Sequence, residues 1–161
     1  MMLRKQILSE WPASSGVPVG EREIAAIATV WVTSEAVDHP IDYAFDNQRG
    51  PGGSRWVAAE PGEQRLILAF DQPQTLRTIT VEIEEPEVSR TQELQVDISM
   101  DDGQTFQNLR RQEYTFSPPG TTFEREEWAV AAAGVTHLQV VIIPDKGGNP
   151  CRATLTTLAL R

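Results

Sequence analysis

Alternating apolar and polar residues predict β-strands along most of this chain. In residues 78–84, Ile79, Val81 and Ile83 share one parity, and two threonines and two glutamates share the other. Residues 94–100 repeat the pattern. A period of two turns apolar side chains toward a core and polar ones toward solvent on a half-buried strand. Both segments are therefore expected to form strands with one solvated face.

Turn residues separate these strands from further candidates. The other strand candidates are residues 29–33, 65–70, 123–130, 136–143 and 152–160. Asp102-Gly103 supplies the positive φ that a tight hairpin needs. The β pattern also breaks at Asp71-Gln72-Pro73, at Glu85-Pro86, and at residues 118–120 and 147–150. Several strands joined by turns, with no long helix between them, predict an all-β, mostly antiparallel sandwich or barrel.

The closing strand candidate changes parity along its length. Leu155 lies on one parity, while Leu158 and Leu160 lie on the other. An extra residue in a strand reverses the parity. A β-bulge near Thr156 is therefore expected to place all three leucines on one face.

The first 23 residues carry a different pattern from the rest of the chain. Apolar residues at helix-like intervals up to Trp11 predict a short helical turn that ends at Pro12. We expect residues 1–23 to form an N-terminal arm that packs on the domain, is disordered or binds a partner. Residues 24–161 are expected to form the domain itself.

Length and charge narrow the class of protein. A chain of 161 residues fits one domain. Its 14 basic and 23 acidic residues give a net charge of −9, which argues against nonspecific nucleic-acid binding. We attribute much of that charge to solvated strand faces, as at Glu82, Glu84 and Asp97. The chain has no apolar run long enough for a secretory or membrane-spanning segment, so a soluble, cytoplasmic protein without membrane contact is expected.

Candidate catalytic chemistry is sparse. Cys151 is the only cysteine, and His39 and His137 are the only histidines that could activate it. The Gly-rich residues 50–54 lack the Lys-Ser/Thr ending of a phosphate-binding loop. The acidic pair Glu82 and Glu84 is expected on a solvated strand face. The sequence therefore predicts a non-enzymatic protein with no cofactor.

An ordered set of motifs resembles the discoidin, or coagulation-factor type C, superfamily. The matching segments are Ala44-Phe45-Asp46-Asn47 before Trp56, Phe70-Asp71-Gln72-Pro73 before Ile79, and the hairpin of residues 99–106 with Phe106 in place of Trp. The resemblance covers residues 29 to about 160. It implies a galactose-binding-like, antiparallel jelly-roll β-sandwich.

The resemblance also implies where a ligand binds. Members of this superfamily bind ligands, many of them carbohydrates, with loops at one end of the sandwich. The corresponding loops here are residues 35–55, 85–92 and 144–151. They offer the ligand-binding candidates His39, Tyr43, Arg49, Arg90 and Asn149, but no Trp. We therefore expect a carbohydrate-binding module.

Four aromatic residues have expected places in such a fold. Trp56 and Phe106 would plug the ends of a two-sheet core, because each aromatic buries about 150–250 Å². Trp31 and Trp128 lie in strand candidates, where either burial or exposure is open. Many members of the superfamily hold a structural calcium near the stretch that contains Asp46, completed by a C-terminal Glu. The closing strand here offers no carboxylate, so we expect no metal.

A second resemblance lies within the same superfamily. Residues 55–64 look like the N-terminal domain of the single-strand-break-repair scaffold protein, with a Trp, paired alanines and Gly-Glu before a strand. That likeness implies an intracellular domain that docks on proteins, with reported DNA contact. The charge of −9 opposes DNA binding. A local basic patch formed by Arg49, Arg55, Arg110 and Arg111 stays an alternative. Protein interaction is therefore the alternative function.

Overall fold

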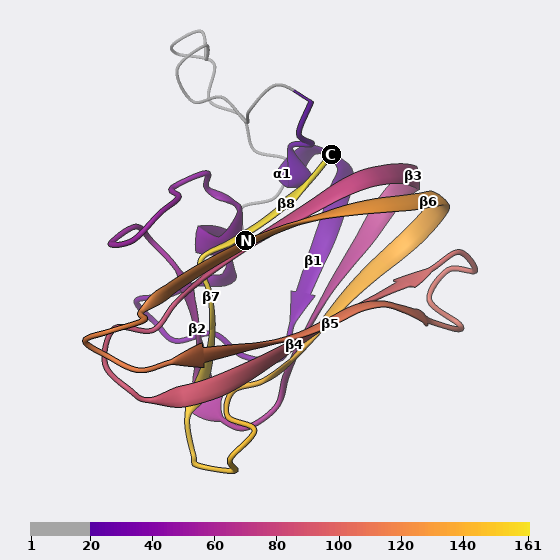
Figure 1. Ribbon diagram of the computed structural model, residues 1–161. Coiled ribbons are helices and arrows are strands. Elements are labelled where there is room, and N and C mark those ends of the chain that lie inside the picture. Colours follow the sequence, from indigo (N-terminus) through magenta and orange to yellow (C-terminus); the bar gives the residue numbers. More distant parts are fainter. Residues whose placement is uncertain (1–19) are drawn as a thin grey trace, which may run out of the picture.

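The computed structural model describes residues 20–161, so most of the arm expected over residues 1–23 lies outside the described residues. The regular secondary structure of the described chain is almost entirely β (Figure 1). Its strands are β1 (Ala28–Val32), β2 (Trp56–Pro61), β3 (Gln64–Glu84), β4 (Arg90–Ser99), β5 (Gln107–Phe116), β6 (Phe123–Ile143), β7 (Arg152–Leu155) and β8 (Thr157–Leu160). A short α-helix, α1 (Ile24–Ile27), and a 3-10 helix, η2 (Ile41–Phe45), complete it.

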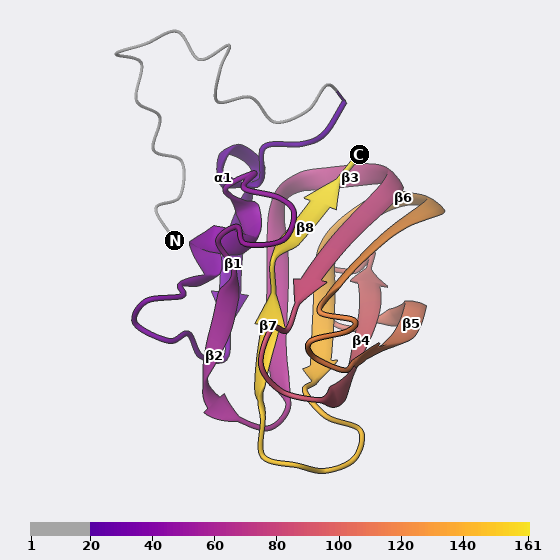
Figure 2. The ribbon, with the colours of Figure 1, turned by 60° about the vertical axis from the view of Figure 1, so that its left-hand side comes forward.

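All strand pairs are antiparallel, as the sequence predicted. One sheet has the order β1-β3-β6-β4-β5, and β8 also pairs with β3. The second sheet consists of β2 and β7, which lie side by side in Figure 2. Strands β2 and β5 were not among the sequence candidates. Strand β5 escapes a pattern search because only Tyr114 and Phe116 of its ten residues are buried.

Strands β3 and β6 are each 21 residues long and replace four shorter candidates. The prediction that Asp71-Gln72-Pro73 ends a strand was wrong, because β3 continues through it. The β3–β6 register instead shifts three times between Ala69 and Thr78. Strands bend at such irregularities, which allows one strand to serve both layers of a sandwich. Figure 1 shows the two strands folding over together at this point.

The parity of the closing strand does change near Thr156, as predicted, and the structure achieves this by a break between two strands. Strand β7 pairs with β2, and β8 pairs with β3. At the break the backbone N–H of Thr156 donates to the carbonyl of Glu82 at 2.8 Å. Leu155, Leu158 and Leu160 are all buried. The chain therefore changes sheets at Thr156 while keeping all three leucines in the core.

The four aromatic residues differ in how deeply they are buried. Trp56 is fully buried, as predicted, and its indole N–H donates to the carbonyl of Ser34 at 2.9 Å. The prediction for Phe106 was wrong, because this side chain is half-buried and lies outside the core cluster. Trp128 belongs to the core, whereas Trp31 is 64% exposed.

The expected solvated face of β3 is covered. Glu82 and Glu84 are only 3% and 7% exposed, so the prediction of solvated carboxylates was wrong. Glu82 accepts from the backbone N–H of Gly50 at 2.8 Å, and Glu84 accepts from that of Gly52 at 2.9 Å. The glycine-rich loop therefore lies on this face, and the two carboxylates satisfy its amides.

Asp97 is also buried, at 5% exposure, against expectation. Its carboxylate accepts from the side-chain amides of Gln95, Asn108 and Gln139 at 3.0–3.2 Å. These neighbours come from β4, β5 and β6, so a polar network crosses three strands. The negative charge of the protein is therefore partly internal and hydrogen-bonded.

The hairpin between β4 and β5 has the predicted turn. Asp102 and Gly103 both adopt positive φ, at 59° and 82°. The preceding residue, Asp101, holds the turn with its carboxylate, which accepts from the backbone N–H and hydroxyl of Thr105 and from the hydroxyl of Ser99. These hydrogen bonds, those from Thr105 first, lower the pKa of Asp101 to about 2.

Candidate ligand-binding site

A cavity of about 320 Å³ opens where the three loops named from the resemblance meet. We call it the loop-end cavity. It is lined by Arg55, Val57, Glu84, Glu85, Glu87, Val88, Arg90, Pro150, Cys151, Arg152 and Thr154. Each of the three loops contributes to this lining, so the expected ligand-binding end of the sandwich does contain a cavity.

Arg90 is the most buried charged side chain of the loop-end cavity, with 1% of the side chain exposed. Its Nη1 donates to the carbonyl of Pro144 at 3.0 Å and to Oε1 of Gln92 at 3.3 Å. Its Nη2 lies 2.8 Å from Oε1 of Glu85. Its Nε is buried and has no hydrogen-bond partner in the described part of the chain. A buried unpaired donor is costly, so the other contacts of Arg90 must offset this cost.

Glu85 fixes both Arg90 and the loop that follows β3. While Oε1 faces Arg90, Oε2 accepts from the backbone N–H groups of Glu87 at 2.9 Å and Val88 at 3.2 Å. The carboxylate therefore shapes the turn between β3 and β4. It also holds the arginine against the cavity wall.

Glu84 performs a similar task for the glycine-rich loop. Its Oε2 accepts from the Gly52 N–H, and its Oε1 lies 3.5 Å from Nη1 of Arg55. His39 supports the same loop, since its Nδ1 lies 3.1 Å from the carbonyl oxygen of Arg55. His39 therefore touches the backbone behind the cavity without lining it.

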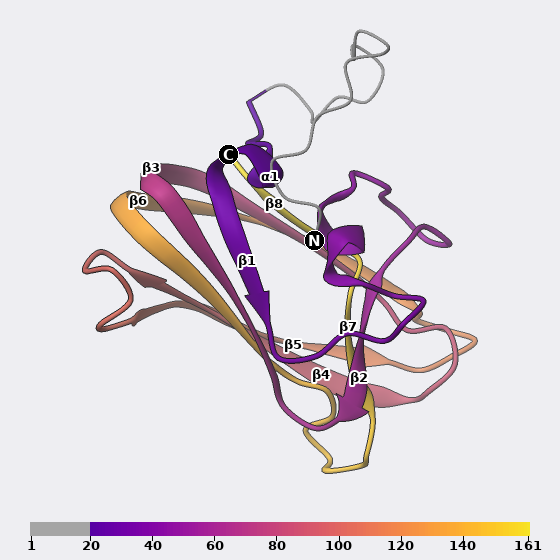
Figure 3. The same ribbon diagram turned by 180° about the vertical axis from the view of Figure 1, so that it is seen from behind.

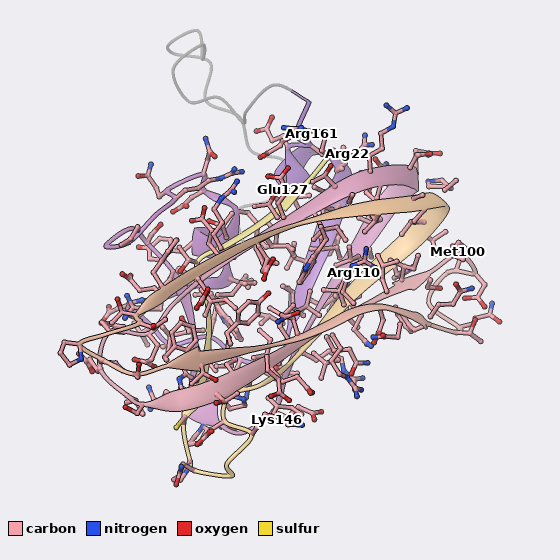
Figure 4. The ribbon with its side chains drawn as sticks, viewed as in Figure 1. Arg22, Met100, Arg110, Glu127, Lys146 and Arg161 are labelled. Atoms are coloured by element: carbon pink, nitrogen blue, oxygen red, sulfur yellow. The ribbon has the colours of Figure 1, made fainter. Side chains whose placement is uncertain are left out.

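The loop of residues 144–151 is tied to β4 on the other side. The backbone N–H of Lys146 donates to the Thr91 carbonyl at 2.8 Å, and its Nζ lies 3.3 Å from Glu93 (Figure 4). Within the loop, Asp145 accepts from the Gly147 N–H at 2.9 Å and from the Asn149 amide at 2.7 Å. Those two bonds lower the pKa of Asp145. Asn149 therefore shapes the loop and does not line the cavity.

The five ligand-binding candidates do not converge. Arg90 lines the loop-end cavity, and its side chain is buried. Tyr43 is half-buried on η2. Arg49 forms an ion pair with Glu21 and lines a separate cavity of about 230 Å³.

The structure also shows the partners of the four arginines that could have formed a local basic patch. Arg49 pairs with Glu21, Arg55 with Glu84, and Arg111 with Gln95 and Glu93. Arg110 reaches from β5 to the carbonyl of Ala129 on β6, at 2.8 Å (Figure 4). The four arginines thus contact different partners, although Arg110 and Arg111 are neighbours on β5.

The sequence reasoning missed two arginines of the loop-end cavity. Arg55 is the last residue of the first loop, and Arg152 directly follows the third. Both stand at the junction of a loop and a strand. A search for basic residues at the strand ends next to the three loops would have found them.

The cavity also contains the only cysteine. Cys151 is a half-buried free thiol, and neither His39 nor His137 joins it in the lining. His137 instead lies beside the Thr136 hydroxyl, 3.1 Å from Nδ1. Among residues 20–161, no group of three His, Cys, Asp or Glu side chains is placed to hold a metal ion. No helix of this part is long and apolar enough to cross a membrane.

Comparison with protein-family models and with curated proteins gives no match. Solved structures do match. The module CBM32-3 from a family 31 glycoside hydrolase of Clostridium perfringens superposes with a TM-score of 0.62 at 12% identity, over 87% of this chain and 93% of that chain. The fold is that of the family 32 carbohydrate-binding modules. The all-β jelly-roll prediction is thereby confirmed.

Two other similar structures contain sugars. The family 32 module of C. perfringens NanJ, in complex with galactose, has a TM-score of 0.59 at 12% identity and covers 87% of this chain and 96% of that chain. The family 32 module of AlyQ, in complex with 4,5-unsaturated mannuronic acid, has a TM-score of 0.57 at 15% identity and covers 84% and 95%. Both likenesses are nearly complete along the two chains compared.

Proposed function

We propose that this protein is a non-catalytic carbohydrate-binding module that holds a sugar in the loop-end cavity. The observation that carries the proposal is the loop-end cavity itself, which opens at the end of the sandwich where the three loops meet and is lined by polar side chains such as Arg55, Glu87 and Arg152. The similarity in fold to modules in complex with galactose and with unsaturated mannuronic acid supports it.

The chemistry of the cavity suits a polyol. A sugar hydroxyl both donates and accepts hydrogen bonds, and the lining offers guanidinium donors beside carboxylate oxygens. No aromatic ring belongs to the described lining, so recognition would rest on hydrogen bonds more than on stacking. Val57, Val88 and Pro150 supply apolar surface for the C–H faces of a sugar ring.

A steric block tests this function. Val88 is 44% exposed at the cavity, so Val88→Arg should fold normally and fill the entrance. Val37→Arg is the matched control, because Val37 is 96% exposed and lies outside the cavity. On a glycan array, the control should keep the signal of the unmodified protein and Val88→Arg should lose it. An array with no signal for the folded protein would reject the proposal.

One observation favours the alternative of protein interaction. Trp31 is 64% exposed on β1, which forms an edge of the large sheet (Figure 3). Its cross-strand partner Ile67 is also only half-buried. Exposed aromatics are common energetic centres of protein interfaces, and unpaired strand edges invite partners. The cytoplasmic location expected from the sequence stays a prediction and would suit this role.

The two functions separate in one pull-down experiment. A protein partner docked on β1 should be lost with Trp31→Ala and kept with Val88→Arg. A partner that is kept by Trp31→Ala would reject docking at this edge.

A further inference from the structure

We propose that two copies of this chain pair along their β1 strands, as an antiparallel dimer whose two-fold axis passes beside Trp31. Such a dimer goes beyond the proposed carbohydrate function and does not depend on it. The open hydrogen-bonding groups of β1, the absence of charge along this strand and the exposed ring of Trp31 all point to it.

The backbone of β1 is hydrogen-bonded on one side only. Its one strand neighbour within residues 20–161 is β3, so the other side is an open edge (Figure 3). The N–H of Thr33 donates to the carbonyl of Arg65 at 3.0 Å, so the backbone groups of Thr33 point at β3. These groups point alternately toward and away from the partner along an antiparallel pair. The N–H and C=O groups of Val30 and Val32 therefore point to the open edge, where the described chain offers them no partner.

This edge also lacks the charges that normally keep strand edges apart. Residues 24–34 contain no Asp, Glu, Lys or Arg. Strand β5, at the opposite end of the same sheet order, carries Arg110, Arg111 and Glu113. Charged residues on an edge strand block edge-to-edge pairing, and β1 has none. Because each copy has a net charge of −9, an uncharged edge is also where a second copy meets little repulsion.

The ends of β1 fix the register of such a dimer, because their backbone groups are already used. The Ala28 N–H donates to a carbonyl of α1, and the Ser34 carbonyl accepts from the indole of Trp56. The free groups thus belong to Val30 and Val32. Antiparallel pairing of Val30 with Val32 of the second copy, and the reverse, satisfies all of them, since each such pair exchanges both of its hydrogen bonds.

The same register places Trp31 opposite Trp31 of the second copy. The two residues form a pair without backbone hydrogen bonds, in which the Cα atoms are about 4.5 Å apart and side chains lie closest. Val30 and Val32 pack against the core, so Trp31 stands on the outer face of the sheet, 64% exposed. It is the one exposed aromatic side chain of residues 20–161. Aromatic pairs directly across two strands stabilise their association, and here each ring covers the other.

Sedimentation equilibrium measures the dimer directly. Because β1 has only five residues, the interface is small, and the unmodified protein should pass from monomer to dimer in the micromolar range. Trp31→Lys removes the aromatic pair and sets two like charges opposite each other, so the dissociation constant should rise about tenfold. Met100→Lys is the matched control, because Met100 is 43% exposed and follows β4, away from β1 (Figure 4). It should leave the dissociation constant unchanged, and thermal melts check that both variants are folded.

Cysteine cross-linking tests the register, in a Cys151→Ala background that removes the native thiol. Trp31→Cys should form an intermolecular disulfide under mild oxidation, because position 31 faces its own copy at a Cα separation that a disulfide spans. Thr29→Cys should not, because position 29 faces position 33 of the second copy. Met100→Cys controls for random collisions of exposed thiols. Failure of Trp31→Cys to cross-link, or equal cross-linking of all three variants, would overturn the proposed pairing.

Other occupants of the edge give different results. A chain that stays monomeric up to about 1 mM would overturn the dimer and leave the carbohydrate function untouched. If that monomer captured a different protein and Trp31→Lys abolished the capture, the edge would belong to a heterologous partner. A dimer that formed only after removal of residues 1–19 would assign the edge to that segment in the unmodified protein, and would equally overturn the proposal.

Discussion

The guanidinium of Arg90 lies 2.8 Å from the carboxylate of Glu85, and 99% of the arginine side chain is buried. From the sequence, Arg90 was expected to bind a ligand from a loop. Its burial indicates that it also stabilises the fold. Arg90→Ala should lower the free energy of unfolding by about 3–5 kcal/mol, because Glu85 would keep a largely buried charge without its partner.

Urea denaturation followed by tryptophan fluorescence measures this loss. Arg152→Ala is the matched control, since Arg152 lines the same cavity but is exposed, and it should change stability by less than about 0.5 kcal/mol. Equal stabilities of the two variants would show that the pair of Arg90 and Glu85 does not support the fold.

The two tryptophans near the ends of β1 and β2 should respond very differently to truncation. Trp56 is fully buried and hydrogen-bonded to Ser34, so Trp56→Ala should cost about 3–5 kcal/mol. Trp31 is 64% exposed, so Trp31→Ala should stay within about 0.5 kcal/mol of the unmodified protein. The same denaturation measurement separates them. A large loss for Trp31→Ala would mean that its ring packs on the sheet more firmly than its exposure indicates.

The alternation of apolar and polar residues correctly predicted which side chains face the core, as at Ile79, Val81 and Ile83. It could not predict what covers the other face of the strand. Glu82 and Glu84 do point away from the core. A loop more than thirty residues earlier in the chain covers them, however, and its backbone N–H groups donate to their carboxylates. That contact depends on the path of residues 46–55, which no local pattern encodes.

The candidate site, too, could be predicted only in part from the sequence. The resemblance named three loops that meet at one cavity, because the position of a loop follows from the order of the strands. It did not identify which side chains line the cavity. Arg90 lies at the first position of β4 and is turned inward by the Pro144 carbonyl, 54 residues away in the chain. Long-range contacts also bring Arg55 and Arg152 to the cavity, since Arg55 pairs with Glu84 and Arg152 pairs with Pro61 across β2 and β7.

Tyr114 offers a stabilising substitution. Its hydroxyl is buried with no hydrogen-bond partner in the described chain. Burial raises the pKa of Tyr114, and the nearby charges of Glu126 and Glu124 raise it further. Tyr114→Phe removes an unsatisfied polar group and should raise the free energy of unfolding by about 1 kcal/mol in chemical denaturation. A less stable phenylalanine variant would show that the hydroxyl has a partner, such as an ordered water.

Metal removal should leave the protein unchanged. The glycine-rich loop is held by Glu82 at Gly50 and by Glu84 at Gly52, and Asp46 accepts from the Gln48 N–H at 2.9 Å. Protein hydrogen bonds thus fix the segment in which the resemblance would place a calcium ion. The melting temperature should be the same in EDTA and in millimolar calcium. An increase with calcium would contradict the prediction, and Asp46→Asn would then show whether this loop binds the ion.

Asp101 should give the hairpin a pH-dependent stability. Its pKa is about 2 in the folded protein against an ordinary value of 3.8, because Thr105 and Ser99 donate hydrogen bonds to the carboxylate. The unfolded chain therefore binds more protons than the folded one between these values, and stability falls as the pH falls through this range. The contribution of Asp101 should be complete above about pH 5 and lost near about pH 2. Denaturation curves across this range should show a shallower acid dependence for Asp101→Asn than for the unmodified protein.

Asp102→Asn removes one charge from the same turn, at a positive φ that Asn tolerates, and so controls for the change in net charge. Identical acid dependence of the two variants would mean that the hydrogen bonds from Thr105 and Ser99 do not stabilise the carboxylate in solution.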